Sequence, residues 1–167
     1  MPKPIPVNEL GSYQFQTPEW VCKLMVSRLD HRVITICEPT PGEGNLLTQI
    51  KKTNKGVLYP PDNYWRWEHS YTIDAFVMNP PFSPATEAYR FLYDAMEKAS
   101  VQIIALMPWW VIINSQKRTE AIYEWGLREV IHLPRSVFPG TRIQTCILDM
   151  VRGYTGKILF TLGGINA

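Results

Sequence analysis

Short apolar runs alternate along this chain with segments of helical periodicity. The runs at 33–37, 74–78 and 101–107 are almost continuously apolar, which is typical of strands buried on both faces of a sheet. Shorter or mixed patterns predict further strands at 128–133, 143–151 and 157–162, and a short strand that begins at Gly56 and runs into an aromatic loop ending at Trp65. Apolar residues at helical spacing, or a polar amphipathic pattern, predict helices at 18–29, 46–55, 87–99 and 115–125.

This order of elements predicts an α/β fold in which helices cover both faces of a mostly parallel sheet. The last strands lack intervening helices, so an antiparallel hairpin is expected at the C-terminal edge of the sheet. Only one short strand fits between the helix near residue 50 and the strand at 74–78, and the sheet is therefore expected to be shortened after its second strand. The length predicts one domain over 13–167, preceded by a proline-containing arm over 1–12.

Composition narrows the class of protein. Hydrophobic residues make up 46% of the chain, which excludes disorder, and no apolar run reaches the length of a membrane span. Cys22, Cys37 and Cys146 are widely separated within apolar patterns and are expected to be buried free thiols, with no metal site. We expect a cytoplasmic protein without a membrane partner. A net charge of +2 does not by itself indicate nucleic-acid binding.

The strand at 74–78 ends in an unusual sequence, Asn79-Pro80-Pro81-Phe82. Two prolines end the strand and restrict the backbone, so the Asn79 side-chain oxygen and the Pro80 carbonyl form a rigid pair of acceptors. An exocyclic amine on an aromatic base is a poor nucleophile because its lone pair is delocalised into the ring. Two acceptors that bind its N–H groups would favour a tetrahedral nitrogen, and the Phe82 ring could stack on the base. The alternative is a proline-rich strand exit without chemistry.

A second motif follows the first strand. Glu38-Pro39-Thr40-Pro41-Gly42-Glu43-Gly44-Asn45 joins a strand to a helix, which is the layout of a nucleotide site. The third glycine of a dinucleotide fingerprint is missing, and no Lys-Ser or Lys-Thr pair completes a P-loop. An acidic residue at the strand end would repel a pyrophosphate and attract an ammonium group. The loop therefore favours S-adenosylmethionine, which carries an α-amine and no phosphate.

A helix start precedes both motifs. Thr17 is predicted to be the N-cap of the first helix, with Pro18 at its first position and Glu19 in its first turn. The exposed N–H groups of such a helix start suit a carboxylate. A capped surface helix without a ligand is the alternative interpretation.

Together the Gln-Thr-Pro segment, the glycine loop and Asn79-Pro80-Pro81-Phe82 resemble, in that order, the gamma arrangement of S-adenosylmethionine-dependent DNA adenine-N6 methyltransferases. The resemblance covers about residues 13–151. It implies a three-layer class I, Rossmann-like methyltransferase sandwich without a target-recognition domain. It also implies that Glu38 faces the methionine ammonium and that Thr17 contacts the methionine carboxylate. The implied cofactor-binding residues are Thr17, Glu38, Pro39, Thr40, Gly42, Gly44, Asn45, Asp62 and Asn79.

Asp62 is the best candidate for the ribose hydroxyls or the adenine, because the shortened chain offers few others; Glu68 is a second choice. Tyr64 or Trp65 could cover the adenine ring. The long loop at 134–142 lies between two predicted strands, and such loops often carry function. The candidate substrate-binding residues are Phe82, Trp109, Arg135, Phe138 and Arg142.

The resemblance implies methyl transfer to adenine N6 in DNA, with the base flipped from the duplex or taken from a single strand. Restriction–modification and phage defence are settings in which such enzymes act. The same tetrapeptide also serves enzymes that methylate adenine in RNA or a glutamine amide in protein. A catalytically impaired DNA-binding subunit is a further alternative, and a short chain without a recognition domain could require a specificity subunit or a second copy.

Overall fold

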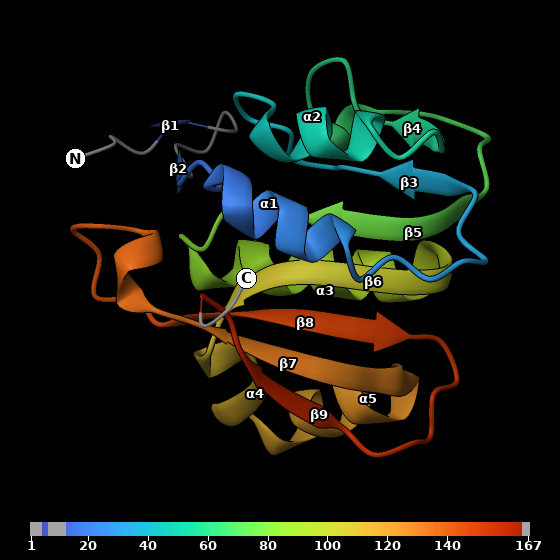
Figure 1. Ribbon diagram of the computed structural model, residues 1–167. Coiled ribbons are helices and arrows are strands. Elements are labelled where there is room, and N and C mark those ends of the chain that lie inside the picture. The colour runs from blue at the N-terminus through green and yellow to red at the C-terminus, as the bar shows by residue number, and fades with distance from the viewer. Residues whose placement is uncertain (1–4, 7–12, 165–167) are drawn as a thin grey trace.

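The computed structural model describes residues 5–6 and 13–164, and its centre is a seven-stranded mixed sheet (Figure 1). The strand order is β4-β3-β5-β6-β8-β7-β9. The strands are β3 (Thr35–Cys37), β4 (Gly56–Leu58), β5 (Ile73–Met78), β6 (Ala99–Pro108), β7 (Leu127–Leu133), β8 (Thr145–Val151) and β9 (Leu159–Leu162). Their order confirms the predicted shortening, because β4 is an edge strand and the chain passes from it to β5 through a single 3₁₀ turn, η1 (Tyr64–Arg66).

The direction of the strands confirms a mostly parallel sheet with an antiparallel C-terminal hairpin. Strands β4, β3, β5 and β6 are parallel, and β8 is antiparallel to both β6 and β7. One feature was not predicted: β9 returns to the far side of β7 and pairs with it in parallel.

Helices cover both faces of the sheet, as the sequence predicts. They are α1 (Glu19–Val26), α2 (Asn45–Lys51), α3 (Ala85–Lys98), α4 (Trp110–Ile113) and α5 (Gln116–Gly126). Helix α1 lies in front of the sheet in Figure 1 and shares a core with α2, whereas α3, α4 and α5 share the core of the other face. Alternate residues of β5 supply the two cores: Ala75 and Val77 face one, Phe76 and Met78 the other. The sequence did not predict α4.

The N-terminal helix begins one residue later than predicted. Pro18 is the N-cap of α1, with φ −58° and ψ 148°, and its carbonyl accepts hydrogen bonds from the Val21 and Cys22 amides. Thr17 is therefore not the cap, and its hydroxyl accepts a hydrogen bond from Asn79 instead. Before this helix, β1 (Ile5–Pro6) pairs antiparallel with β2 (Tyr13–Gln14); the rest of the predicted arm lies outside the described residues.

All three cysteines are buried free thiols, as predicted. Burial raises the pKa of the Cys22 and Cys146 thiols to about 12, so both stay protonated and act as small apolar side chains. Within the described ranges, no helix is long and apolar enough to span a membrane.

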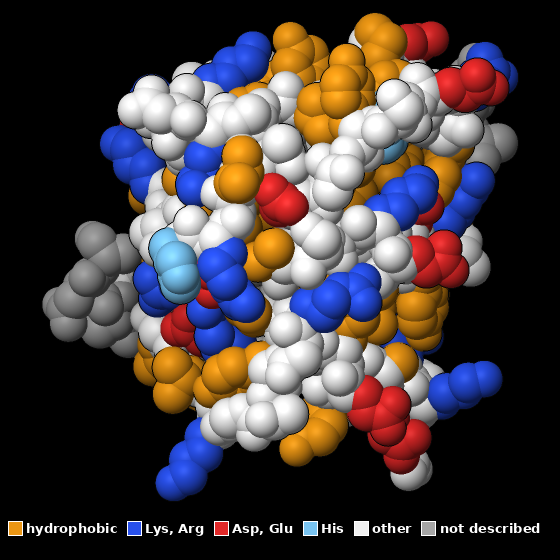
Figure 2. Space-filling view, turned by 90° about the vertical axis from the view of Figure 1, so that its right-hand side faces the viewer, with side chains coloured by type: hydrophobic (Ala, Val, Ile, Leu, Met, Phe, Trp, Pro, Cys, Tyr) orange, Lys and Arg blue, Asp and Glu red, His pale blue; other side chains and the backbone are white. Residues whose placement is uncertain are grey.

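The side of the molecule at which the parallel strands begin carries mixed charge (Figure 2). Lys and Arg side chains lie there beside acidic ones, so the described residues on this side form no surface of a single sign.

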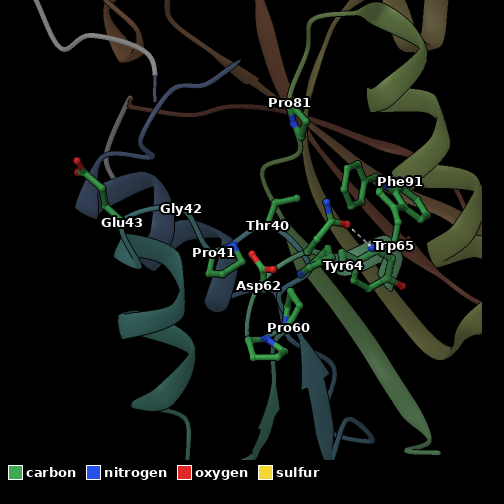
Figure 3. Close-up of a pocket in the computed structure, with 13 residues that line it drawn as sticks. Thr40, Pro41, Gly42, Glu43, Pro60, Asp62, Tyr64, Trp65, Pro81 and Phe91 are labelled. Carbon is green, nitrogen blue, oxygen red and sulfur yellow. Dashed lines mark hydrogen bonds between the residues drawn. The ribbon is translucent and has the colours of Figure 1, made fainter. Parts of the chain in front are cut away.

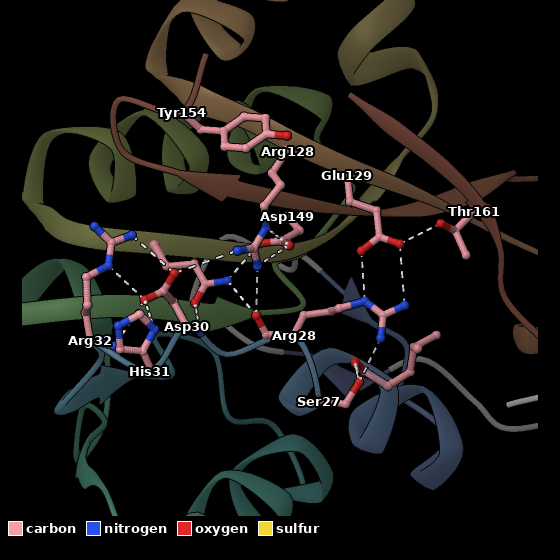
Figure 4. Close-up of polar contacts among 12 residues, drawn as sticks. Ser27, Arg28, Asp30, His31, Arg32, Arg128, Glu129, Asp149, Tyr154 and Thr161 are labelled. Atoms are coloured by element: carbon pink, nitrogen blue, oxygen red, sulfur yellow. Dashed lines mark hydrogen bonds and ion pairs between the residues drawn. The ribbon is translucent and has the colours of Figure 1, made fainter. Parts of the chain in front are cut away.

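A buried ionic network at this side joins α1 to the sheet (Figure 4). Arg128 donates two hydrogen bonds to Asp149 Oδ2, at 2.9 and 2.7 Å, and Gln102 donates to Asp149 Oδ1 at 2.8 Å. Both Gln102 and Arg128 also donate to the Arg28 carbonyl, and the Arg28 guanidinium pairs with Glu129 at 2.8 Å. The network thus fixes the C-terminal end of α1 against β6, β7 and β8.

We expect Asp149→Ala to destabilise the fold strongly. Asp149 is fully buried, and its removal takes away the carboxylate that accepts two hydrogen bonds from Arg128, leaving that guanidinium, among the described residues, only the longer carboxylate contact with Asp30 at 3.7 Å. Breaking such a buried pair costs about 3–5 kcal/mol of unfolding free energy. Urea unfolding followed by circular dichroism measures this loss. The exposed Asp62→Ala is the control, with an expected change of less than about 0.5 kcal/mol; equal effects of the two substitutions would contradict the prediction.

Candidate functional site

The predicted site residues gather at the edge where the parallel strands end, on the left in Figure 1. Strand β3 ends before Glu38, β5 ends before Asn79, and β6 ends at Pro108. The pairing of Pro108 with Thr145 and of Thr145 with Leu133 places the 134–144 loop at the same edge. This is the edge at which open α/β sheets bind their ligands.

Asn79 is almost fully buried, with 2% of its surface exposed, and its carboxamide is held by the N-terminal segment. Its Nδ2 donates to the Phe15 carbonyl at 2.7 Å and to Thr17 Oγ1 at 3.0 Å. Its backbone carbonyl accepts from the Thr40 hydroxyl at 3.1 Å. The glycine loop and the segment before α1 thus meet at the end of β5.

The two prolines after Asn79 are buried, and the Phe82 ring is half-buried against both hydrophobic cores. Pro81 also lines the cavity described below. The tetrapeptide is therefore a packed, rigid strand exit, as its two prolines predict.

Glu38 is a buried carboxylate at the end of β3. Its Oε1 accepts hydrogen bonds from the Thr40 amide at 2.9 Å and the Thr40 hydroxyl at 3.3 Å. Burial raises its pKa to about 8, although both Thr40 bonds lower it. No ion pair within the described part of the chain includes Glu38, so its negative charge has no protein cation beside it.

The raised pKa makes stability depend on pH. The Glu38 carboxyl contributes stability that is fully present below its unfolded pKa, near 4.5, and is lost as pH rises through its folded pKa, near 8. A Glu38→Gln variant carries no ionisable group but can accept the same two hydrogen bonds. We expect it to melt at a higher temperature than the wild type at pH 8, with the difference vanishing towards pH 5. Thermal unfolding across this range checks the sign; a difference that grows towards pH 5 would contradict it.

The glycine loop turns sharply between Glu38 and α2. Gly42 and Gly44 have φ of 54° and 88°, in the left-handed region that favours glycine, and the Gly44 amide donates to the Pro41 carbonyl at 2.8 Å. A Cβ on Gly44 would meet no atom within 4 Å, so backbone conformation rather than space requires glycine there. Asn45 opens α2, and its Nδ2 donates to the Thr17 carbonyl at 3.2 Å.

A cavity of about 430 Å³ lies between the glycine loop and the segment after β4 (Figure 3). Pro39, Thr40 and Gly42 line it, together with the predicted Asp62. Figure 3 shows the Asp62 carboxylate directed towards the middle of the cavity, near Pro41. The volume falls within the range of small-molecule sites. Glu38, Thr17, Gly44, Asn45 and Asn79 do not line this cavity but support the loops beside it.

The two aromatic candidates after Asp62 differ in position. Tyr64 is 7% exposed, and its hydroxyl donates to Asp94, so it is mainly a core residue. Trp65 is half-buried. Its ring centroid lies 4.6 Å from the ring centroid of Phe91 and 3.7 Å from the Arg90 guanidinium carbon. Both line the cavity. The Asn63 side chain accepts from the Trp65 amide at 2.9 Å and so caps the turn that carries both rings.

The predicted substrate residues lie at the same edge with different exposures. Arg135 and Arg142 are exposed. Trp109 Nε1 donates to His132 Nδ1 at 3.1 Å, which turns this ring towards β7. Phe138 is 5% exposed, and its ring centroid lies 5.9 Å from that of Phe15. In this structure Phe138 packs on Phe15 and supports the loop, so its role as a substrate-binding residue stays a prediction.

Sequence reasoning missed Phe15 as a contributor, and it placed Gln16 in the Gln-Thr-Pro segment without assigning it a contact. The Gln16 side-chain oxygen accepts from the Glu43 amide at 3.2 Å, and the Phe15 carbonyl accepts from Asn79. A backbone carbonyl leaves no sequence signal. The position of Phe15 directly before the Gln-Thr-Pro segment was a hint in the sequence.

Solved structures with the same architecture were found, although no protein-family model and no curated protein matches the chain. A modification subunit of a type I restriction enzyme from Vibrio vulnificus superposes with a TM-score of 0.70 at 16% identity, covering 89% of this chain and 47% of that one. A type I restriction–modification methyltransferase subunit from Streptococcus thermophilus gives 0.67 at 19% identity, with coverages of 89% and 47%.

A protein from Listeria monocytogenes, described as a class I S-adenosylmethionine-dependent methyltransferase, gives a TM-score of 0.68 at 14% identity and covers 88% of this chain and 65% of that one. At these identities the comparisons establish the fold, which is the Rossmann-like fold of class I methyltransferases. The chain spans less than two thirds of the length of each of these structures, and about half of the two restriction subunits.

Proposed function

We propose that this chain transfers a methyl group from S-adenosylmethionine to the N6 amine of adenine in DNA. The observation that carries the proposal is Asn79: a buried carboxamide held by two hydrogen bonds at the end of β5, followed by Pro80-Pro81-Phe82. It lies one hydrogen bond from Thr40 in the glycine loop, beside a cavity of cofactor size. A carboxamide with these neighbours suits the binding of an exocyclic amine.

The residues around the cavity fit S-adenosylmethionine. Glu38 is a buried acid with no ion-pair partner among the residues that the structure describes, as expected of a group that supports a ligand ammonium. The backbone at Thr40 and Gly42 lines one wall of the cavity and can approach the cofactor closely. On the opposite wall, Asp62 supplies a carboxylate for hydroxyl groups of the cofactor. Among the residues that the structure describes, no lysine or arginine lines the cavity, which argues against a phosphate-bearing nucleotide. When bound, S-adenosylmethionine supplies an electrophilic methyl group on its sulfonium.

The acceptors at the end of β5 act on the substrate. The Asn79 Oδ1 and the Pro80 carbonyl accept the two N6 hydrogens of adenine, which favours a tetrahedral nitrogen and directs its lone pair outward. The Phe82 ring stacks on the base. The amine becomes acidic once alkylated and loses its proton to water or to these acceptors, so no strong general base is required.

The base has to leave the helical stack to reach a buried asparagine. Arg135 and Arg142 are exposed at the same edge and can bind phosphates of the displaced strand. Two of the similar structures are parts of multisubunit restriction enzymes, and this chain spans about half their length. A separate specificity subunit or a second copy of the chain is therefore part of the proposal.

Labelled methyl transfer tests the proposed function. The protein is incubated with methyl-labelled S-adenosylmethionine and single-stranded DNA, duplex DNA, RNA or protein, and the nucleosides are then separated. We expect label in N6-methyladenine of DNA. Label only in RNA adenine or in protein glutamine would replace the substrate with one of those alternatives. Calorimetric titration that detects no S-adenosylmethionine binding would overturn the enzyme assignment and favour a non-catalytic subunit.

A further inference from the structure

The segment Phe15-Gln16-Thr17 connects three parts of the site edge. The Phe15 carbonyl and the Thr17 hydroxyl accept from Asn79 Nδ2. The Thr17 carbonyl accepts from Asn45 at the start of α2. The Phe15 ring packs on Phe138 of the 134–144 loop. This three-residue segment thus contacts the end of β5, the start of α2 after the glycine loop, and the 134–144 loop after β7.

These contacts decide which way the Asn79 carboxamide is turned. A carboxamide presents two N–H donors on one side and an acceptor oxygen on the other. The opposite rotamer would bring Oδ1 to 2.7 Å from the Phe15 carbonyl oxygen, where neither atom has a hydrogen to donate. The Thr17 hydroxyl at 3.0 Å accepts the second Nδ2 hydrogen. With both hydrogens bound on the side of the segment, Oδ1 points to the opposite side.

We infer that Thr17, together with the Phe15 carbonyl, is a positioning residue that orients Asn79 so that its oxygen accepts from the target amine. This inference rests on the proposed function and deepens it. It differs from the cofactor-carboxylate contact that the resemblance implies for Thr17. In the structure the Thr17 side chain is 4% exposed, does not line the cavity and is directed at Asn79.

The segment is itself held in place, so the orientation is not left to one hydrogen bond. Gln16 accepts from the Glu43 amide at 3.2 Å, and the Cys22 thiol donates to the Thr17 carbonyl at 3.5 Å. Glu43 belongs to the glycine loop and Asn45 to the start of α2. The segment therefore also couples the glycine loop to Asn79, the residue proposed to accept from the substrate amine.

Paired substitutions at Thr17 test the inference. Thr17→Val keeps the shape of the side chain but loses the acceptor, whereas Thr17→Ser keeps the acceptor. We expect kcat for DNA methylation to fall about 3- to 10-fold in Thr17→Val, with an unchanged Kd for S-adenosylmethionine, and to recover in Thr17→Ser. Thr53→Val is the control, since it removes a hydroxyl bound to the Ile50 carbonyl at the far end of α2. A raised Kd with an unchanged kcat would overturn the inference and restore a cofactor contact.

A measurement independent of activity separates this inference from the proposed function. In protein labelled with ¹⁵N asparagine, the Asn79 side-chain NH₂ signal is identified by its absence in Asn79→Ala. We expect slow hydrogen exchange at this group in the wild type and in Thr17→Ser, and at least tenfold faster exchange in Thr17→Val. Equal exchange in all three proteins would overturn the inference, whether or not any substrate is methylated. A wild type with this protection but no methyl transfer would overturn the proposed function alone.

Discussion

An Asn79→Ala variant is expected to lose most methyl transfer while it still binds S-adenosylmethionine. The substitution removes the side-chain acceptor from the end of β5 but leaves the glycine loop, Glu38 and the cavity lining unchanged. Loss of one preorganised hydrogen-bonding group at a reacting centre lowers kcat by about 10²- to 10³-fold. Initial rates with labelled cofactor and DNA at saturation measure this change.

The control for this prediction separates chemistry from folding. Asn79 also donates two hydrogen bonds within the protein, so the alanine variant leaves the Phe15 carbonyl without its partner. An Asn79→Asp variant keeps the size and an acceptor oxygen, but it replaces the Nδ2 donors with a second oxygen and adds an ionisable carboxyl group beside the Phe15 carbonyl. Thermal unfolding of both variants, alongside calorimetric titration of the cofactor, shows whether the fold persists. Full activity of a folded Asn79→Ala protein would refute the assignment of Asn79.

A Glu38→Gln variant is expected to bind S-adenosylmethionine about 10- to 100-fold more weakly at pH 8, because it removes the charge that complements the ligand ammonium. Glutamine is close in shape to glutamate and can still accept from Thr40, so the loop conformation is expected to persist. Isothermal titration calorimetry measures the affinity. Glu124→Gln on the far part of α5, an exposed site, is expected to leave it unchanged.

The affinity for S-adenosylmethionine is also expected to depend on pH through the charge of Glu38. The Glu38 carboxyl has a pKa of about 8 in the free protein, so protonation increasingly competes with the ammonium as pH falls below 8. The affinity of the wild type should therefore fall by up to about tenfold per pH unit below that value. Above it, the ligand amine loses its own proton, since α-amines titrate near pH 8. The affinity of Glu38→Gln should not fall as pH is lowered below 8. If it does fall, another group causes the pH dependence.

Much of the architecture follows from local sequence. The continuous apolar runs of β3, β5 and β6 identify buried strands because such runs are stable only between two layers of helices. The glycines of the loop after β3 mark left-handed backbone, and the two prolines after Asn79 mark a strand end. The short interval between α2 and β5 leaves space for a single strand, and β4 is that strand. These features depend on neighbours along the chain.

Tertiary structure decided the partners of the site residues. Thr17 resembles a helix cap in the sequence, yet the helix begins after Pro18 and the Thr17 hydroxyl lies against Asn79, 62 residues further along. Phe138 lies in a loop of the sequence, and the fold buries it beside Phe15, more than 100 residues away along the chain. Tyr64 lines the cavity, and only the fold shows that its hydroxyl also donates to Asp94.

The sequence by itself therefore determined most of the element order apart from α4, the approximate ends of the central strands and the residue types at the site edge, because hydrophobic periodicity, glycine and proline act on a few adjacent residues. Only the tertiary structure decided which acceptors hold the Asn79 carboxamide, why Glu38 retains an unusually high pKa, and where the cavity opens beside Asp62. Those properties arise from groups brought together across the sheet edge by chain closure, and burial sets their strength.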